Sequence, residues 1–350
     1  MLLNNIINVR KEYYKDVKRG GKTRSSNFEL LRIVCMLLII CGHIIMVHKY
    51  EEIYDSSWYI KQIVRPFSAV AVNTFVLISG YFGIKMKLRK LMSINNMVTF
   101  YSVAFLILSV SIGIHNISLS KDWMQIFPVL TKQYWFITVY FVLCLISPFL
   151  NILVEHLEQA QYEKLLLTCF GIFVALPTIG FISNFPSVTS DSGYGIVNFV
   201  FLYLLGRYLR LYFRINIKRS WYLLGYIFSM GICCLFQICY SKVFGFTFDA
   251  LISYDTLFVF IGAICLFLYF SKLTLSSRCV NVLSAGCLAV YVIHLHPLFY
   301  EYLFTNVLCV KEYVGLRYLM LLIIAPCLIY ICCILIEQIR SRIFSIFNLK

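Results

Sequence analysis

The sequence predicts an all-α integral membrane protein, a bundle of about ten transmembrane helices with both termini in the cytoplasm. The chain is 61% hydrophobic and only 13% charged, whereas a soluble domain carries about 25% charged residues. Its apolar residues gather in stretches of about 20, the length that spans a bilayer. Its 31 basic residues lie mostly between these stretches.

Ten apolar stretches satisfy the length criterion for a membrane span. They are residues 28–48, 66–84, 94–115, 134–151, 164–183, 195–213, 221–241, 251–270, 281–304 and 315–337. The second, eighth and ninth contain polar residues, which favour the interior of the bundle over a lipid-facing position. These residues are Asn73, Ser79, Asp255, Ser284 and His294.

The distribution of lysine and arginine predicts the orientation. With a cytoplasmic N-terminus, 23 of the 31 basic residues fall on the cytoplasmic side, as the positive-inside rule requires. We expect a basic cytoplasmic tail at 1–27, a membrane domain at 28–340 and a cytoplasmic tail at 341–350. The loops are too short for a soluble domain, so the net charge of +15 indicates the lipid bilayer as partner and no nucleic acid.

The first apolar stretch contains Glu29, Arg32 and His43. Eleven residues separate Arg32 from His43, close to three helical turns, so both project from one face about 16 Å apart along the axis. Glu29 lies one turn before Arg32 on the same side. Charged groups in a span are costly, which makes a functional site the default hypothesis. The simpler alternatives are a hydrogen-bonded core histidine and an arginine that snorkels to the interface.

Two further basic groups lie on the predicted cytoplasmic side. One is the cluster Lys85, Lys87, Arg89 and Lys90, and the other is Arg207, Arg210 and Arg214 on one helical face. Both are explained as topology anchors beside anionic headgroups, or as partners for the phosphates of a nucleotide-bearing ligand. The 14 cysteines show no spacing typical of a metal site, so no metal or permanently bound cofactor is expected.

Four motifs in chain order resemble the acyltransferase-3 superfamily of integral-membrane acyltransferases. The first is Glu29, Arg32 and, after ten more residues, His43. The second is the aromatic-x-x-x-Ser-Gly stretch from Phe75 to Gly80. The third runs from Tyr134-Trp135-Phe136 through Tyr140 to Ser147-Pro148-Phe149. The fourth is Tyr291-Val-Ile-His294-Leu-His296-Pro297-Leu. The resemblance covers about residues 25–340 and is greatest to short bacterial members from capsule and exopolysaccharide genes.

The resemblance implies transfer of an acyl group, most often acetyl, from cytoplasmic acyl-CoA to a hydroxyl of a surface glycan or its lipid-linked precursor, in a bacterial plasma membrane. His43 would be the general base or the covalent acyl acceptor. Arg32 would contact a donor phosphate or carbonyl, and Glu29 would orient Arg32 or pair with it at the surface. The basic groups, including Lys85, Lys87, Arg89, Lys90, Arg207 and Arg210, would bind coenzyme A. The family's Arg-x-x-Arg is replaced here by Lys-x-Lys-x-Arg-Lys.

Four residues are weaker candidates for substrate binding: Ser79, Trp135, Asp255 and His294. Each has a simpler interpretation. Ser79-Gly80 suits close helix packing, Tyr134 and Trp135 suit an interfacial aromatic belt, and Asp255 suits a solvated interfacial acid. His294 and His296 differ by about 200° on a helix and cannot share a face, and His296 before Pro297 indicates a kink or helix end.

Taken without the family resemblance, the same residues also fit a different class of protein. A polytopic transporter or flippase for a glycolipid or an anion would also have about ten spans with arginine and histidine inside the membrane.

Overall fold

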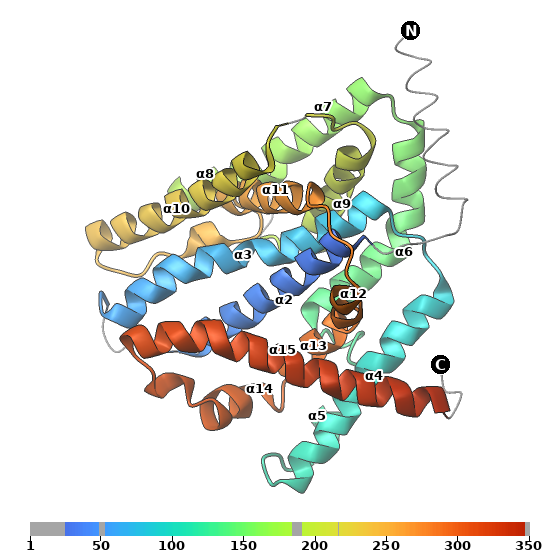
Figure 1. Cartoon of the computed structure of the whole chain (residues 1–350), viewed down its shortest axis with the longest axis vertical. Helices are drawn as coiled ribbons and strands as arrows, with labels where there is room; N and C mark the ends of the chain where they lie inside the picture. The colour runs from blue at the N-terminus through green and yellow to red at the C-terminus, as the bar shows by residue number, and fades with distance from the viewer. Residues whose placement is uncertain (1–24, 49–52, 184–190, 216, 347–350) are drawn as a thin grey trace.

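The structure, a computed structural model, describes residues 25–48, 53–183, 191–215 and 217–346. Most of the predicted N-terminal tail and the last four residues lie outside this range. In the described range the secondary structure is helical (Figure 1). Eight segments are long and apolar enough to cross a membrane. They are α2 (Ser26–Val47), α3 (Ser56–Phe82), α4 (Leu88–Ser111), α6 (Trp135–His156), the run from α7 (Gln159–Phe170) through η2 (Gly171–Ala175) to α8 (Leu176–Ser183), α10 (Arg219–Phe244), the run from η3 (Ala250–Ile252) to α11 (Leu257–Ser271), and α15 (Gly315–Ile346).

Two predicted spans form shorter helices. The stretch 195–213 is α9, Ile196–Leu211. The stretch 281–304 divides into α12 (Arg278–Ser284), α13 (Cys287–His294), α14 (Tyr300–Tyr302) and η4 (Leu303–Val307). The short elements α5 (Leu119–Asp122), η1 (Trp123–Gln125) and η5 (Val310–Glu312) complete the described chain. The number of spans and the side of each terminus stay predictions.

Some helices begin or end away from the predicted span boundaries. The second span begins at Ser56, ten residues before the predicted start, because Asp55 caps α3 by accepting a hydrogen bond from the Trp58 N–H at 2.5 Å. Pro66 lies inside α3, as neighbouring helices allow in membrane proteins. The predicted C-terminal tail from 341 is helical to Ile346. By contrast, α13 ends at His294, as Pro297 predicted.

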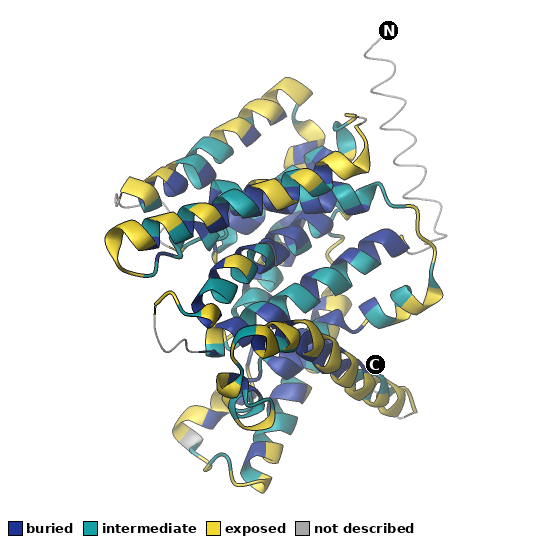
Figure 2. Cartoon of the chain, turned by 60° about the vertical axis from the view of Figure 1, so that its left-hand side comes forward, coloured by how far each residue is buried: buried dark blue, intermediate teal, exposed yellow. Residues whose placement is uncertain are grey.

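Helices α2 and α3 lie side by side in the middle of the bundle (Figure 1). The helix faces turned toward the centre of the bundle are buried, and the exposed residues lie on the outer faces of the surrounding helices (Figure 2). Large apolar side chains such as Phe228, Leu235 and Ile323 are among the exposed ones. Apolar outer faces with polar residues inside are the arrangement that a bilayer favours, because lipid cannot satisfy polar groups.

Close backbone contact joins α3 to α9. A methyl group added to Gly80 would overlap the backbone carbonyl of Tyr203, and one added to Gly206 would lie 2.8 Å from the Tyr81 nitrogen. The packing interpretation of Ser79-Gly80 is therefore confirmed for Gly80. Small residues let membrane helices approach closely enough for van der Waals contact along their length.

We expect Gly80→Ala to destabilise the protein, because the added methyl group forces α3 away from α9. Overpacking of this kind costs about 1–3 kcal/mol. Gly231→Ala is the matched control, since no atom lies within 4 Å of the added carbon and alanine is the better helix former. Thermal unfolding in detergent should show a lower midpoint for Gly80→Ala only. Equal midpoints for the two variants would contradict this account of the interface.

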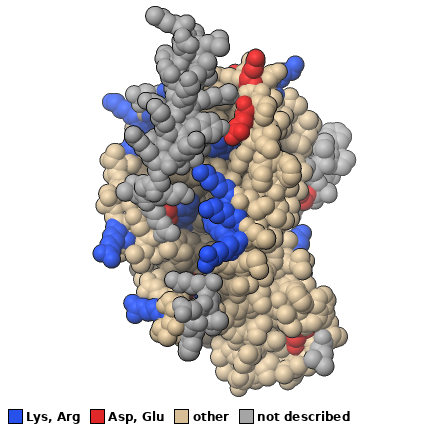
Figure 3. All heavy atoms as spheres, turned by 90° about the vertical axis from the view of Figure 1, so that its right-hand side faces the viewer, with Lys and Arg blue, Asp and Glu red and all other residues tan. Residues whose placement is uncertain are grey.

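Four helix ends meet at one face of the bundle. The Asn27 amide at the start of α2 donates to the Phe270 carbonyl at the end of α11 at 3.0 Å. The Phe28 ring lies 5.1 Å from that of Tyr81 near the end of α3, and Arg210 at the end of α9 donates to the Tyr81 hydroxyl at 3.1 Å. Figure 3 views the molecule from this side, and lysine and arginine gather in a stripe near its middle. We call this the basic face; its cytoplasmic location is a prediction.

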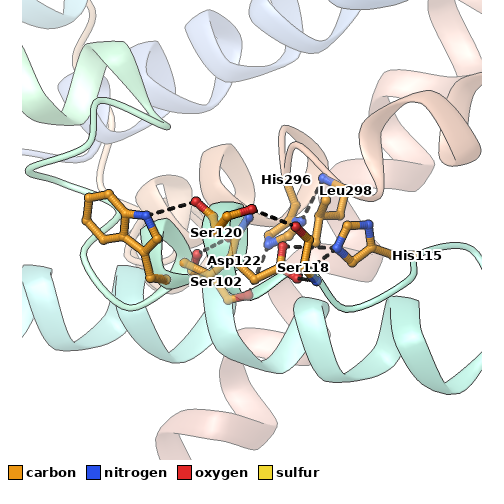
Figure 4. Close-up of polar contacts among 9 residues, drawn as sticks. Ser102, His115, Ser118, Ser120, Asp122, His296 and Leu298 are labelled. Carbon is orange, nitrogen blue, oxygen red and sulfur yellow. Dashed lines mark hydrogen bonds and ion pairs between the residues drawn. The ribbon is translucent and has the colours of Figure 1, made fainter.

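A polar network orders the chain after α4, outside the membrane-spanning helices (Figure 4). The Asp122 carboxylate accepts the Ser118 backbone N–H at 2.7 Å and lies 3.0 Å from the His115 ring. The Ser118 hydrogen bond lowers the pKa of Asp122 below its ordinary value; burial opposes this and His115 reinforces it. Nearby, His296 accepts a hydrogen bond from the Leu298 N–H and donates one to the Ser102 carbonyl. Each of its two ring nitrogens is therefore hydrogen-bonded to a backbone group.

We expect acid to loosen the segment around Ser118. Because the pKa of Asp122 is lowered by folding, its contribution to stability is complete above the unfolded value of about 3.9 and is lost as pH falls through the folded value. Asp122→Asn should lose part of this contribution already at neutral pH. Hydrogen exchange at Ser118, relative to free peptide at the same pH, measures it. Protection that is unchanged in the variant would rule out the carboxylate's role.

Candidate active site

A cavity of about 1010 Å³ lies between α2, α3, α4, α6 and the α12–α13 pair, and the segments around Tyr194 and Tyr254 close one end. Its wall follows α2 from Glu29 to Met46, roughly 25 Å along the helix axis. That distance is most of the hydrocarbon thickness of a bilayer, about 30 Å. One end of the cavity is therefore near the basic face, and the other is near the opposite face.

At the basic end, the predicted Glu29–Arg32 pair lies inside the cavity wall. Arg32 Nη1 is 2.6 Å from Glu29 Oε1, and the hydroxyl of Ser284 donates to Glu29 Oε2 at 2.5 Å. Glu29 is buried, so both of its oxygens hold partners in the protein. Of the two alternatives for Glu29, this geometry favours orientation of Arg32 over a surface pair. Lys90 reaches the same end of the cavity.

Further along the α2 wall, about three helical turns after Arg32, His43 lines the cavity and contacts a second histidine. His43 Nδ1 lies 3.2 Å from Nε2 of His294, which comes from the end of α13. The two rings have centroids 5.3 Å apart. His43 lines the cavity, whereas His294 is buried behind it. His296 instead stacks on Phe105 with centroids 5.0 Å apart, which confirms that the two late histidines use different faces.

Two hydroxyls line the wall between the basic end and His43. Ser79 donates to the Phe75 carbonyl of its own helix at 3.0 Å, and its oxygen lies 3.4 Å from that of Tyr140. The Tyr140 ring stacks on Phe136, with centroids 5.9 Å apart. Ser79 lines the cavity as well as adjoining the packing glycine, so both interpretations made from the sequence fit its position.

At the far end, three aromatic rings form one cluster. Trp135 stacks on Tyr254 with centroids 5.9 Å apart and contacts Tyr194 at 4.6 Å, and the two tyrosines are 4.7 Å apart. Arg65 and Asp249 form an ion pair beside the cluster. All five line the cavity. We call this set of residues the aromatic end.

Backbone contacts hold the aromatic end in place. The Asn73 amide donates to the Tyr254 carbonyl at 2.7 Å, and the Tyr254 N–H donates to Ser192 O at 3.1 Å. Gly193, which follows Ser192, has φ +78°, and a Cβ atom added there would lie 2.8 Å from the Cβ of Tyr254. Only glycine therefore fits this turn. The expectation of an interfacial belt is wrong for Tyr134, which is 2% exposed, and it does not describe Trp135 on the cavity wall.

Other predicted residues lie away from the cavity. Lys85 and Lys87 are exposed on the loop before α4, and Arg89 is exposed in the first turn of α4. Arg210 is exposed beside Tyr81, with its guanidinium 5.1 Å from the ring centroid. Arg207 is buried against Gly83. The expectation that Asp255 is a solvated acid is wrong, because it is 1% exposed.

Several cavity residues were not predicted as site residues from the sequence, among them Arg65, Tyr140, Tyr194, Asp249, Tyr254 and Ser284. Ser284 carried a signal as a polar residue within an apolar stretch, and Tyr140 lay inside a family-like motif. Arg65 and Asp249 carried none, because an ion pair between residues so distant in the chain has no sequence pattern.

A long cavity with a few polar and charged groups on its wall, inside a helical membrane protein, is an arrangement found in transporters and in membrane-embedded transferases. The acyltransferase-3 family model, described as an acyltransferase domain, matches residues 25–338. The chain therefore belongs to the acyltransferase-3 family and is a multi-pass membrane acyltransferase, which confirms the resemblance seen in its motifs. Neither the curated proteins nor the solved structures that were searched include a match to it.

Proposed function

We propose that this protein is an O-acyltransferase that moves an acetyl group from acyl-CoA at the basic face to a hydroxyl of a glycan, or of its lipid-linked precursor, at the opposite face. The observation that carries the proposal is the continuity of the large cavity. It brings Arg32 and Lys90, His43 and the aromatic end onto one continuous wall. A bacterial plasma membrane is the proposed location, with the basic face in the cytoplasm.

The basic end suits the thioester donor. Arg32 has one guanidinium nitrogen on Glu29, which leaves further N–H donors for the cavity. A planar guanidinium that a buried carboxylate holds in place can donate hydrogen bonds to a phosphate or to a carbonyl oxygen. Lys90 adds a second cation there. Lys85, Lys87, Arg89 and Arg210 are exposed and lie outside the cavity, where they would bind the outer phosphates of coenzyme A.

His43 carries the chemistry in this proposal. As the acceptor hydroxyl attacks the thioester carbonyl, its proton moves to His43, the carbon–sulfur bond breaks, and the thiolate takes the proton as free coenzyme A. The alternative route forms an acyl-imidazole on His43 first and transfers the acyl group to the hydroxyl second. Both routes convert one thioester and one hydroxyl to one ester and one thiol.

The aromatic end suits a sugar acceptor. Flat faces of Trp135, Tyr194 and Tyr254 match the apolar face of a pyranose ring, and the Arg65–Asp249 pair offers hydrogen bonds to hydroxyls at the ring edge. A binding site of few polar groups among aromatic walls is typical for small ligands. Asp255, buried next to Tyr254, would then support this end of the cavity without touching the sugar.

Sided membrane vesicles test the proposal, because acetyl-CoA does not cross a bilayer. With acetyl-labelled coenzyme A outside, inverted vesicles should label glycan and release free thiol, and right-side-out vesicles should do neither. Label in right-side-out vesicles alone would reverse the orientation. No thiol release from detergent-solubilised protein with acceptor present would favour the transporter alternative and reject the enzyme.

A further inference from the structure

His294 lies behind the proposed catalytic histidine and does not itself line the cavity. Its side chain is 1% exposed, and both ring nitrogens have partners. Nδ1 is 2.6 Å from the carbonyl oxygen of Val290, one turn earlier in α13, and Nε2 is 3.2 Å from His43 Nδ1. A polar ring buried in this way requires a partner for each nitrogen, because an unpaired group is costly there.

The partners determine where the protons are. A carbonyl oxygen only accepts hydrogen bonds, so His294 Nδ1 carries a hydrogen. In the neutral ring the other nitrogen then has a lone pair, so His294 Nε2 accepts. The donor must be Nδ1–H of His43, which leaves the lone pair of His43 on Nε2. That nitrogen has no hydrogen-bond partner in the described chain, and the residue lines the cavity.

We propose that His294 is a positioning residue that holds His43 in the Nδ1–H tautomer, so that the Nε2 lone pair is available to the acceptor hydroxyl. The inference rests on the proposed function of His43. The Val290 carbonyl sets the direction of both hydrogen bonds of the His294 ring. The Tyr300 hydroxyl donates to the His43 carbonyl at 3.2 Å and so fixes the backbone of His43. When His43 takes a proton, its bond to His294 becomes charge-assisted and stronger.

A neutral imidazole suits this position better than a carboxylate would. In the serine-protease triad an aspartate orients the histidine, and the wrong tautomer lowers kcat by about 10⁴. A second ionised group at the centre of a membrane bundle would add its own desolvation cost. A histidine anchored to a helix carbonyl supplies the acceptor without a permanent charge, at the price of a weaker interaction with the protonated ring.

Two variants separate this role from packing. In His294→Gln, the side-chain oxygen reaches about as far as Nε2 and can still accept from His43. His294→Leu has a similar size and no acceptor. We expect kcat to fall about 10²-fold or more in the leucine variant with acyl-CoA affinity unchanged, and to recover to within about 10-fold of wild type in the glutamine variant. Equal kcat values for the two variants would overturn the proposal.

Nitrogen-15 NMR of histidine-labelled wild-type protein gives a readout that does not depend on activity or on the two His294 variants folding. His43, identified by the signals lost in His43→Ala, should show a protonated Nδ1 and an unprotonated Nε2. A protonated Nε2 in the neutral ring would reject the inference even if the enzyme is active. An inactive wild-type protein with the expected tautomer would instead reject the proposed function and leave the histidine pair standing.

Discussion

His43→Ala is expected to abolish acyl transfer without removing the protein from the membrane. Loss of a general base typically lowers the rate by about 10²–10⁴, and loss of a covalent acyl carrier lowers it further. Insertion should persist, because alanine is easier to place in a span than histidine. The donor should still bind, since Arg32 and Lys90 lie at the other end of the cavity wall.

The measurement is the O-acyl content of the glycan together with protein abundance in the same membranes. His48→Ala is the matched control, at the C-cap residue that directly follows the same helix. The His48 ring lies 2.9 Å from the Tyr313 carbonyl and stacks on Tyr318 at 4.0 Å, outside the cavity, so its loss should reduce stability and leave the rate per folded molecule unchanged. A fully acylated glycan with normal amounts of His43→Ala protein would make His43 a packing residue.

Arg32→Lys is expected to weaken acyl-CoA binding by about 10- to 100-fold. Lysine keeps the charge but cannot reproduce a planar fork that holds Glu29 and a ligand oxygen together. A hydrogen bond to a charged group contributes about 1.5–3 kcal/mol, and each 1.4 kcal/mol is a factor of ten in affinity. Wild-type binding should also weaken as salt rises, because partly exposed ion pairs are screened.

The test is equilibrium binding of acyl-CoA to purified protein, with Arg317→Lys as the control for the same chemical change. Arg317 is exposed near the start of α15, the helix end opposite the predicted cytoplasmic side, and should have no effect on the donor. Glu29→Gln should produce a smaller loss, since an uncharged partner holds the guanidinium less firmly. Unchanged affinity in Arg32→Lys would reduce Arg32 to an anchor at the membrane surface.

Local patterns predicted much of this protein. Helical periodicity placed Glu29, Arg32 and His43 on one face of a span, and all three line the cavity. Pro297 predicted the end of α13 near His294. The boundaries that failed did so where tertiary contacts override local preference: Pro66 is accommodated inside α3, and the predicted ninth span divides between Ser284 and Cys287.

The cavity itself depends on residues that are far apart in the chain. Ser284 reaches Glu29 across 255 residues, and His294 reaches His43 across 251. No periodic pattern encodes such pairs, because they exist only once α12 and α13 pack beside α2. The same reason applies to the aromatic end, where Trp135 meets Tyr194 and Tyr254 from separate segments.

The sequence by itself determined the class of the protein, its apolar helices, the basic residues that separate them and the polar stripe of α2. These follow from composition and from a period of 3.6 residues, which are properties of neighbours in the chain. Only the tertiary structure decided which side chains share a cavity and which nitrogen of His43 faces His294. Those depend on the packing of helices, where a bilayer allows polar groups only if each finds a partner in the protein.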